Sequence, residues 1–230
     1  MLALGHRDAM KLFLFGVMHA SPVCRDRYLS RLRTIFLDQG TPAFVAVEAA
    51  PRLFRETILP QRTEFRDLAM ADSQFTHYGT PFIDALAKCL GFEADAHTEI
   101  YGQPGPAIIW LDEHRDEDEN DHGFAPSYGL NYYHWFKNWI GQDPCPTVQG
   151  AFSRIHDGIN CSSQGPSLQE AIYRRDAIWA DRINERIERC SPDDHAIVTV
   201  GLDHLGKDPR SVLSRLIQVA KCEAIDLTME

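Results

Sequence analysis

The chain has 230 residues, of which 44% are hydrophobic and 24% are charged. That length and composition favour one packed domain over residues 1–230 and exclude a wholly disordered chain. The net charge of −10 disfavours nucleic acid as the main partner, because binding to phosphates needs a basic surface.

Neither the cysteines nor the apolar runs indicate a secreted or membrane-spanning protein. The six cysteines include no Cys-x-x-Cys pair, which argues against a zinc ribbon and fits the reduced thiols of a cytoplasmic protein. No apolar run has the length of a membrane span. The run Leu12–Met18 looks like a short signal peptide, but a similar pattern recurs at 197–204, so we expect an uncleaved start.

Strand and helix patterns alternate in the first part of the chain. Lys11–Val17 is apolar on both faces, as in a buried parallel strand. Arg25–Gln39 then shows a helical apolar stripe that ends at Gly40. A second apolar run, Ala43–Val47, ends in Glu48. This strand–helix–strand order predicts a right-handed parallel crossover.

The central part of the chain is less regular. Leu53–Ala71 has a mixed helical pattern, Pro81–Leu90 predicts a compact amphipathic helix, and Ala107–Leu111 predicts a third strand. Residues 112–166 then change character, from an acidic run to a segment rich in aromatic side chains. We interpret 112–166 as an insertion over the core, a possible lid, with one short helix near Tyr132–Trp139.

The last third of the chain returns to an alternating pattern. The capping box Ser167–Glu170 begins a helix that continues to about Cys190. A strand at His195–Val200, a helix at Pro209–Ala220 and a short strand near Glu223–Leu227 follow. The whole pattern predicts an α/β fold with a mostly parallel central sheet flanked by helices and a central insertion.

One short element occurs near both ends of the chain. An apolar run is followed by Gly16-Val17-Met18-His19 near the start and by Gly201-Leu202-Asp203-His204 near the end. Both units then continue into a stretch with the tetrapeptide Leu-Ser-Arg-Leu, at 29–32 and at 213–216. The fold is therefore expected to contain two approximately related halves.

Polar side chains follow four of the predicted strands, namely His19, Glu48, Asp112 and His204. In a parallel sheet these positions share the carboxyl edge, where α/β proteins place their ligand sites. Two imidazoles and a carboxylate are a common ligand set for a divalent transition metal with an open position for water. Taken one at a time, each of these residues could equally have a structural role, as a hydrogen-bonded histidine or a turn cap.

The long helix contributes Arg175, which lies three residues after Ile172 and four before Trp179, inside the apolar stripe. A buried guanidinium needs a partner. We expect that partner to be a site carboxylate such as Glu48 or the negative charge on a substrate oxygen. A purely structural ion pair is the alternative. The neighbouring Arg174 falls on a solvated line.

Four features occur in order along the chain: the elements Gly16–His19 and Gly201–His204, the strand Val45–Val47 ending in Glu48, and Arg175-Asp176 followed by Trp179-Ala180. In these features the chain resembles the superfamily of TraB/PrgY/GumN, TIKI, erythromycin-esterase-like and ChaN-like proteins. The resemblance covers residues 12–48 and about 172–216. One departure is Arg174, where relatives often carry glutamate.

The resemblance implies an α/β fold with a site between two related halves, built on His19, Glu48, Arg175 and His204. TIKI members resemble metal-dependent peptidases, erythromycin-esterase members hydrolyse a macrolide lactone, and ChaN-like members bind haem. We therefore expect a metal-dependent hydrolase that cleaves an amide (peptide) or ester bond. Its substrate would be a peptide or a small ester or amide.

In this interpretation His19, Glu48 and His204 would hold a divalent transition metal, with Asp112 as a further participant. Arg175 would stabilise the oxyanion or anchor a substrate carboxylate. Without a metal, one histidine oriented by Glu48 would act as general base towards water. The alternatives are a non-catalytic protein that binds haem or another small ligand in the same cleft, and a degenerate interaction domain. The sequence gives no sign of an oligomeric state.

Overall fold

A computed structural model describes residues 10–102, 104–112, 128–141, 143, 145–160 and 166–227. At its centre lies a sheet of five strands in the order β3-β2-β4-β1-β5, in which every neighbouring pair is parallel. The strands are β1 (Lys11–Val17), β2 (Phe44–Val47), β3 (Ala107–Trp110), β4 (His195–Gly201) and β5 (Lys221–Asp226). The predicted fold class, a mostly parallel α/β sheet flanked by helices, is confirmed.

The two Gly-x-x-His units lie side by side in the sheet. β1 pairs with β4 over its whole length, with Lys11 opposite His195 and Val17 opposite Gly201. All seven residues of β4 are buried, and six of the seven residues of β1 are buried. Because both strands run in the same direction, the chain leaves them at the same edge of the sheet.

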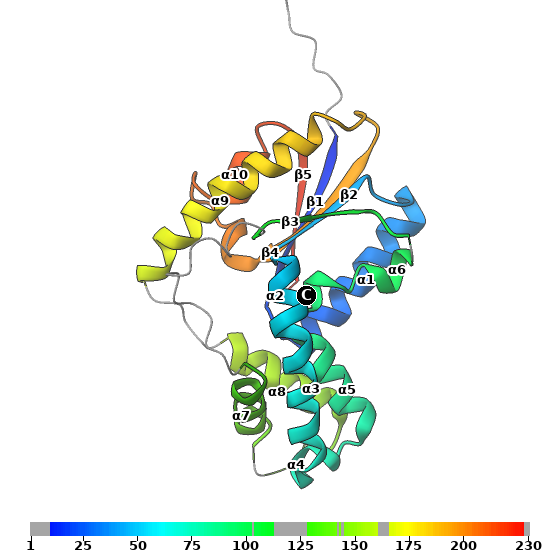
Figure 1. Cartoon of the computed structure of the whole chain (residues 1–230), viewed down its shortest axis with the longest axis vertical. Coiled ribbons are helices and arrows are strands. Elements are labelled where there is room, and N and C mark those ends of the chain that lie inside the picture. Colours follow the sequence, from blue (N-terminus) through cyan, green and yellow to red (C-terminus); the bar gives the residue numbers. More distant parts are fainter. Residues whose placement is uncertain are drawn as a thin grey trace, which may run out of the picture.

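Helices cover both faces of the sheet (Figure 1). The helices α1 (Pro22–Gln39) and α6 (Thr98–Tyr101) lie on one face, and α9 (Pro166–Ile187) and α10 (Val212–Leu216) lie on the other. Successive side chains of β1 point to opposite faces of the sheet. Phe13 and Phe15 pack in the core under α1, and Leu12 and Leu14 pack in the core under α9. Each such buried side chain contributes about 1.5–3 kcal/mol to stability.

Five further helices form a lobe below the carboxyl edge of the sheet (Figure 1). They are α3 (Leu59–Met70), α4 (Ser73–Thr76), α5 (Thr80–Cys89), α7 (Tyr128–Ile140) and α8 (Val148–Asn160). This helical lobe has its own aromatic core, in which Phe65 makes edge contacts with Phe75 and Phe136, and Phe82 stacks on Phe152. A short helix α2 (Pro51–Leu53) and a π-helical turn η1 (Phe54–Ile58) lead from β2 into the lobe.

The central region differs from the sequence-based expectation. Instead of one short helix near Tyr132–Trp139, the described residues contain both α7 and α8. Gly158 on α8 makes their packing possible, because a Cβ there would lie only 2.4 Å from Cγ of Trp139. These helices share one core with α3 and α5, so they are part of the lobe.

Other boundaries also shifted, and some expectations lie outside the described residues. The helix expected at Pro209–Ala220 is only Val212–Leu216, capped by the Ser211 hydroxyl. The acidic run, from 113 to 121, and the side chains of the capping box at 167–170 lie outside the described residues. Within the described ranges, no helix combines the length and the apolar character needed to cross a bilayer.

Candidate functional site

Four loops at the carboxyl edge of the sheet bring the predicted site residues together. His19 lies two residues beyond β1, Glu48 directly follows β2, and Asp112 lies two residues beyond β3. His204 lies in the 3-10 turn η4 (Leu202–Leu205) that follows β4. Because β1, β4, β2 and β3 are consecutive in the sheet, the four side chains emerge in one row. Arg175 reaches this row from α9.

Glu48 is the centre of the constellation. Its Oε1 accepts a hydrogen bond from Nη2 of Arg175 at 2.7 Å, and its Oε2 accepts one from the backbone N–H of Gly201 at 2.6 Å. Nε2 of His19 lies 3.4 Å from Oε2, and Nε2 of His204 lies 3.6 Å from Oε1. Both imidazoles and the guanidinium therefore face one carboxylate.

A separate carboxylate orients each imidazole. Nδ1 of His19 donates to Oε1 of Glu93 at 2.9 Å, and Nδ1 of His204 donates to Oδ1 of Asp176. Asp176 is fully buried, and its second oxygen accepts from the backbone N–H of Val212 at 3.2 Å. Each ring is therefore held by its Nδ1 and presents its Nε2 to the site.

Arg175 is fixed on three sides and has a buried donor without a partner within the described residues. Its Nη2 also donates to Oδ2 of Asp112 at 3.2 Å, and its guanidinium carbon lies 4.5 Å from the ring of Trp179. The same indole lies against the imidazole of His204, with 4.5 Å between the ring centroids. Nε of Arg175 is buried and has no hydrogen-bond partner within the described residues. A buried donor without a partner is costly, which sets this guanidinium apart from a satisfied structural ion pair.

The charges of the site are strongly coupled. Burial alone would lower the pKa of His204, but Glu48 and then Asp176 outweigh it and raise that pKa to about 9. Burial also opposes the charged form of His19, yet Glu93 and Glu48 raise its pKa well above the usual value. Burial would raise the pKa of Glu48, but the two imidazoles hold it well below its usual range. Glu48 is therefore ionised at neutral pH, and His204 is protonated.

Backbone geometry makes the close approach possible. Gly201 leaves no room for a side chain, because a Cβ there would lie 3.0 Å from Nε2 of His19 and 3.3 Å from Oε2 of Glu48. On the other side, Ala20 has a φ of 62°, in the left-handed region that L-residues rarely adopt. This turn lets Ser21 cap α1, by accepting from the N–H of Cys24, while His19 points back into the site.

Sequence reasoning missed the two orienting carboxylates. Asp176 had a detectable signal, because it precedes Trp179 by three residues and so lies on the buried side of the long helix. Glu93 had none, because it sits in the three-residue 3-10 turn η2 (Phe92–Ala94) with no periodic pattern. It nevertheless has only 5% of its surface exposed.

The donor types suit a divalent transition metal. Two imidazole Nε2 atoms face the carboxylate of Glu48, and both rings have the Nδ1–carboxylate bond that is usual behind metal-bound histidines. The geometry does not by itself indicate a metal site, because across the described ranges no group of three or more His, Cys, Asp or Glu side chains is arranged to hold an ion. The metal therefore stays a prediction.

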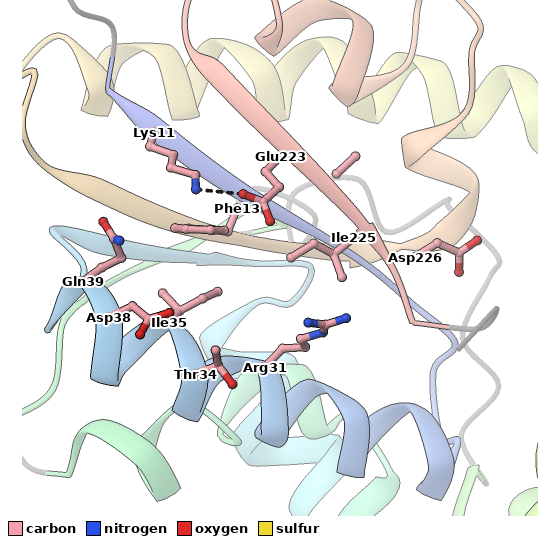
Figure 2. A pocket seen from close by; sticks show the side chains of 11 residues that line it. Lys11, Phe13, Arg31, Thr34, Ile35, Asp38, Gln39, Glu223, Ile225 and Asp226 are labelled. Atoms are coloured by element: carbon pink, nitrogen blue, oxygen red, sulfur yellow. Dashed lines mark ion pairs between the residues drawn. The ribbon is translucent and has the colours of Figure 1, made fainter.

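A pocket of about 400 Å³ lies away from these residues (Figure 2). It is lined by the C-terminal half of α1 and by β1 and β5, and Lys11 forms an ion pair with Glu223 across it at 2.8 Å. None of the site residues described above lines this pocket, which also carries Arg31 and Asp38 on its helix side. The candidate site and the pocket are therefore separate features.

Comparison with protein-family models, with curated proteins and with solved structures gives no match. The resemblance to the TraB, TIKI, erythromycin-esterase-like and ChaN-like superfamily therefore stays a prediction from the sequence.

Proposed function

We propose that the protein is a cytoplasmic hydrolase that adds water to the carbonyl of an amide (peptide) or ester substrate at this site. One observation supports it most. Two imidazoles, each oriented by its own carboxylate, face a single shared glutamate, beside a guanidinium with an unused N–H. A purely structural ion pair needs neither two oriented rings nor an unpaired donor. Strongly shifted pKa values in such a cluster are typical of active sites.

His19 is the candidate for proton transfer. Its side chain is 40% exposed, whereas that of His204 is 4% exposed, so His19 is the imidazole that a substrate can reach. The raised pKa keeps His19 protonated at neutral pH, so its deprotonated form, which increases as the pH rises, would accept a proton from water as the oxygen bonds to the carbonyl carbon. The same proton would then pass to the leaving nitrogen or oxygen as its bond to carbon breaks. Glu93 holds the ring in the orientation for both transfers.

Arg175 is the candidate for charge stabilisation. Its guanidinium, on a side chain that is 23% exposed, would stabilise the carbonyl oxygen as negative charge develops there, while Glu48 and Asp112 hold it in place. His19, Glu48 and His204 would hold a divalent transition metal. When bound, that ion would polarise the carbonyl and lower the pKa of water. The haem-type alternative has weaker support, because His204 is enclosed by Trp179 and Asp176.

The proposal is tested with His19→Ala and His204→Ala, assayed on generic peptide and ester substrates. We expect each variant to lose about 100-fold to 10,000-fold in turnover while keeping the far-UV circular dichroism of the parent protein. His134→Ala, an exposed histidine on α7, is the matched control and should retain full activity. Normal turnover in either site variant would reject the proposed site.

The metal component is tested separately. Metal analysis of the purified protein is combined with activity measured before and after a chelator, and after adding Zn²⁺, Mn²⁺ or Co²⁺. We expect activity to fall with chelation and to return with one of the ions. Full activity after complete removal of metal would reject the metal component and leave His19 as general base.

A further inference from the structure

The turn that carries His19 is embedded in the helical lobe. Ala20, the next residue, is fully buried in the core that α3, α5, α7 and α8 share. Ser21 is also fully buried, and its hydroxyl is hydrogen-bonded to Nδ1 of His156 on α8 at 2.9 Å. The positive φ of Ala20 is thus maintained by packing from the lobe, because a free chain would avoid that conformation.

Hydrogen bonds also attach the turn that carries Glu93 to the lobe. Arg62 on α3 donates from Nε to the carbonyl of Leu90 at 2.8 Å. Its two terminal nitrogens bond both oxygens of Asp95, at 2.7 and 3.1 Å. Glu93 lies between these two attachment points, and the Arg62 side chain is 13% exposed and that of Asp95 39% exposed. Bidentate contacts of this kind fix geometry as well as position.

His204 is held by a different part of the fold. Its ring is bonded to Asp176 and packs on Trp179, and both of these residues are on α9. α9 packs on the sheet through the core that contains Trp179 and Ile183, which is not the core of the lobe. The two imidazoles of the site therefore take their positions from two separate packing units.

We infer that the helical lobe is the positioning element for His19, and that Arg62 is the residue through which it fixes the Glu93–His19 hydrogen bond. The expected effect on catalysis rests on the proposed function. The expected effect on the Glu93–His19 hydrogen bond rests on geometry alone. Without the guanidinium, the segment 90–95 loses four hydrogen bonds to α3. The turn then keeps the packing of Phe92 and Ala94 in the core under α1, but the Glu93 carboxylate is held less firmly against Nδ1 of His19.

The test uses Arg62→Met, which keeps much of the volume of the side chain and removes every donor. Arg66→Met is the matched control, because Arg66 lies one turn further on α3 and forms an exposed ion pair with Asp84 at 2.7 Å. Both proteins are labelled with ¹⁵N-histidine, and the downfield imidazole N–H signals are recorded by NMR. The signal of His19 is assigned by its loss in His19→Gln.

We expect Arg62→Met to lose or strongly broaden the Nδ1–H signal of His19 through faster exchange with water, while that of His204 persists. We also expect kcat to fall about 10-fold to 100-fold with little change in KM, the usual effect of removing an outer partner of a catalytic histidine. Arg66→Met should keep both signals and its kcat. A general loss of stability would weaken both imidazole signals together.

An unchanged His19 signal in Arg62→Met would overturn the inference, whatever the activity. If that variant does not fold, Asp95→Asn carries the same expectation, because it removes the ion pair and keeps the bond to the carbonyl of Leu90. The NMR result also stands alone. A protein without hydrolase activity would reject the proposed function, yet loss of the His19 signal would still support the clamp.

Discussion

Replacing Glu48 by Gln is the most informative single change, because the amide keeps the shape of the side chain and removes its charge. The backbone N–H of Gly201 still meets an oxygen acceptor, so the loop after β4 keeps its contact. Arg175 keeps Asp112 but loses its shorter bond, and both imidazoles lose the carboxylate that they face.

The expected loss of stability is about 3 kcal/mol at pH 7. A hydrogen bond to a charged group contributes about 1.5–3 kcal/mol, and the remaining Asp112 contact keeps the Arg175 part near the lower end. The rise of the His204 pKa from 6.5 to about 9 corresponds to about 3 kcal/mol, at about 1.4 kcal/mol per pKa unit. Asp176 shares that effect, so we assign about half of it to Glu48.

The loss should depend on pH in a defined direction. His204 has a raised pKa in the folded protein, so its stabilisation is complete below about pH 6.5 and disappears as the pH rises through about 9. Glu48 has a lowered pKa, so its stabilisation is complete above about pH 4.5 and disappears as the pH falls through the folded value. The difference between the parent protein and Glu48→Gln is therefore largest near pH 5–7 and smaller at pH 10.

Urea unfolding of the chelator-treated proteins at pH 6, 8 and 10 measures this difference. In thermal unfolding of the same proteins, a loss of about 3 kcal/mol corresponds to a fall of about 10 °C in Tm for a chain of this length. The control is Glu223→Gln, in an ion pair with Lys11 that is half exposed and should contribute less than about 1 kcal/mol. A loss below 1 kcal/mol at pH 6, or the same loss at pH 6 and pH 10, would refute the coupling of Glu48 to His204.

Two further substitutions probe the backbone of the site. Gly201→Ala should lower kcat at least 100-fold, because its Cβ would lie 3.0 Å from Nε2 of His19. It should lower the stability by only about 1–2 kcal/mol, because the φ of −54° suits alanine. Turnover is measured by the activity assay and stability by chemical denaturation, and parent-like turnover would contradict this prediction. Ala20→Val should destabilise the protein by more than about 3 kcal/mol, because a β-branched residue is poorly tolerated at a φ of 62° in a filled core. Ala20→Gly should stay within about 1 kcal/mol of the parent protein, because relief of the backbone strain offsets the lost methyl group.

The sheet could be predicted because its central strands are buried on both faces. β1 and β4 are continuous apolar runs, and such runs identify parallel strands without any knowledge of the partner strand. The rule that parallel strands share one carboxyl edge then placed His19, Glu48, Asp112 and His204 in one row. Arg175 followed from helical periodicity, because a charge inside an apolar stripe must have a buried partner.

The patterns at Leu53–Ala71 and Pro81–Leu90 indicated α3 and α5, but α8 and the packing of the helical lobe could not be predicted in the same way. α3 contributes Phe65 and Ala69 to one core while Arg62 reaches across to the turn at 91–95, so its apolar pattern is interrupted by a residue that is polar for a structural reason. α8 depends on Gly158, whose role becomes visible only when Trp139 is packed against it. Local periodicity describes the apolar face of a helix but not the neighbour against which that face packs.

The orientation of the two imidazoles is the part of the site that sequence patterns could not supply. His19 takes its orientation from Glu93, 74 residues away, and His204 from Asp176, 28 residues away. A strand-end rule gives the position of a histidine but not which of its nitrogens is occupied, and that choice decides whether Nε2 is available for chemistry. The two carboxylates that make this choice lie beside different cores, Glu93 between Phe92 and Ala94 under α1 and Asp176 near Trp179 under α9, so each ring depends on packing that its own strand does not reveal.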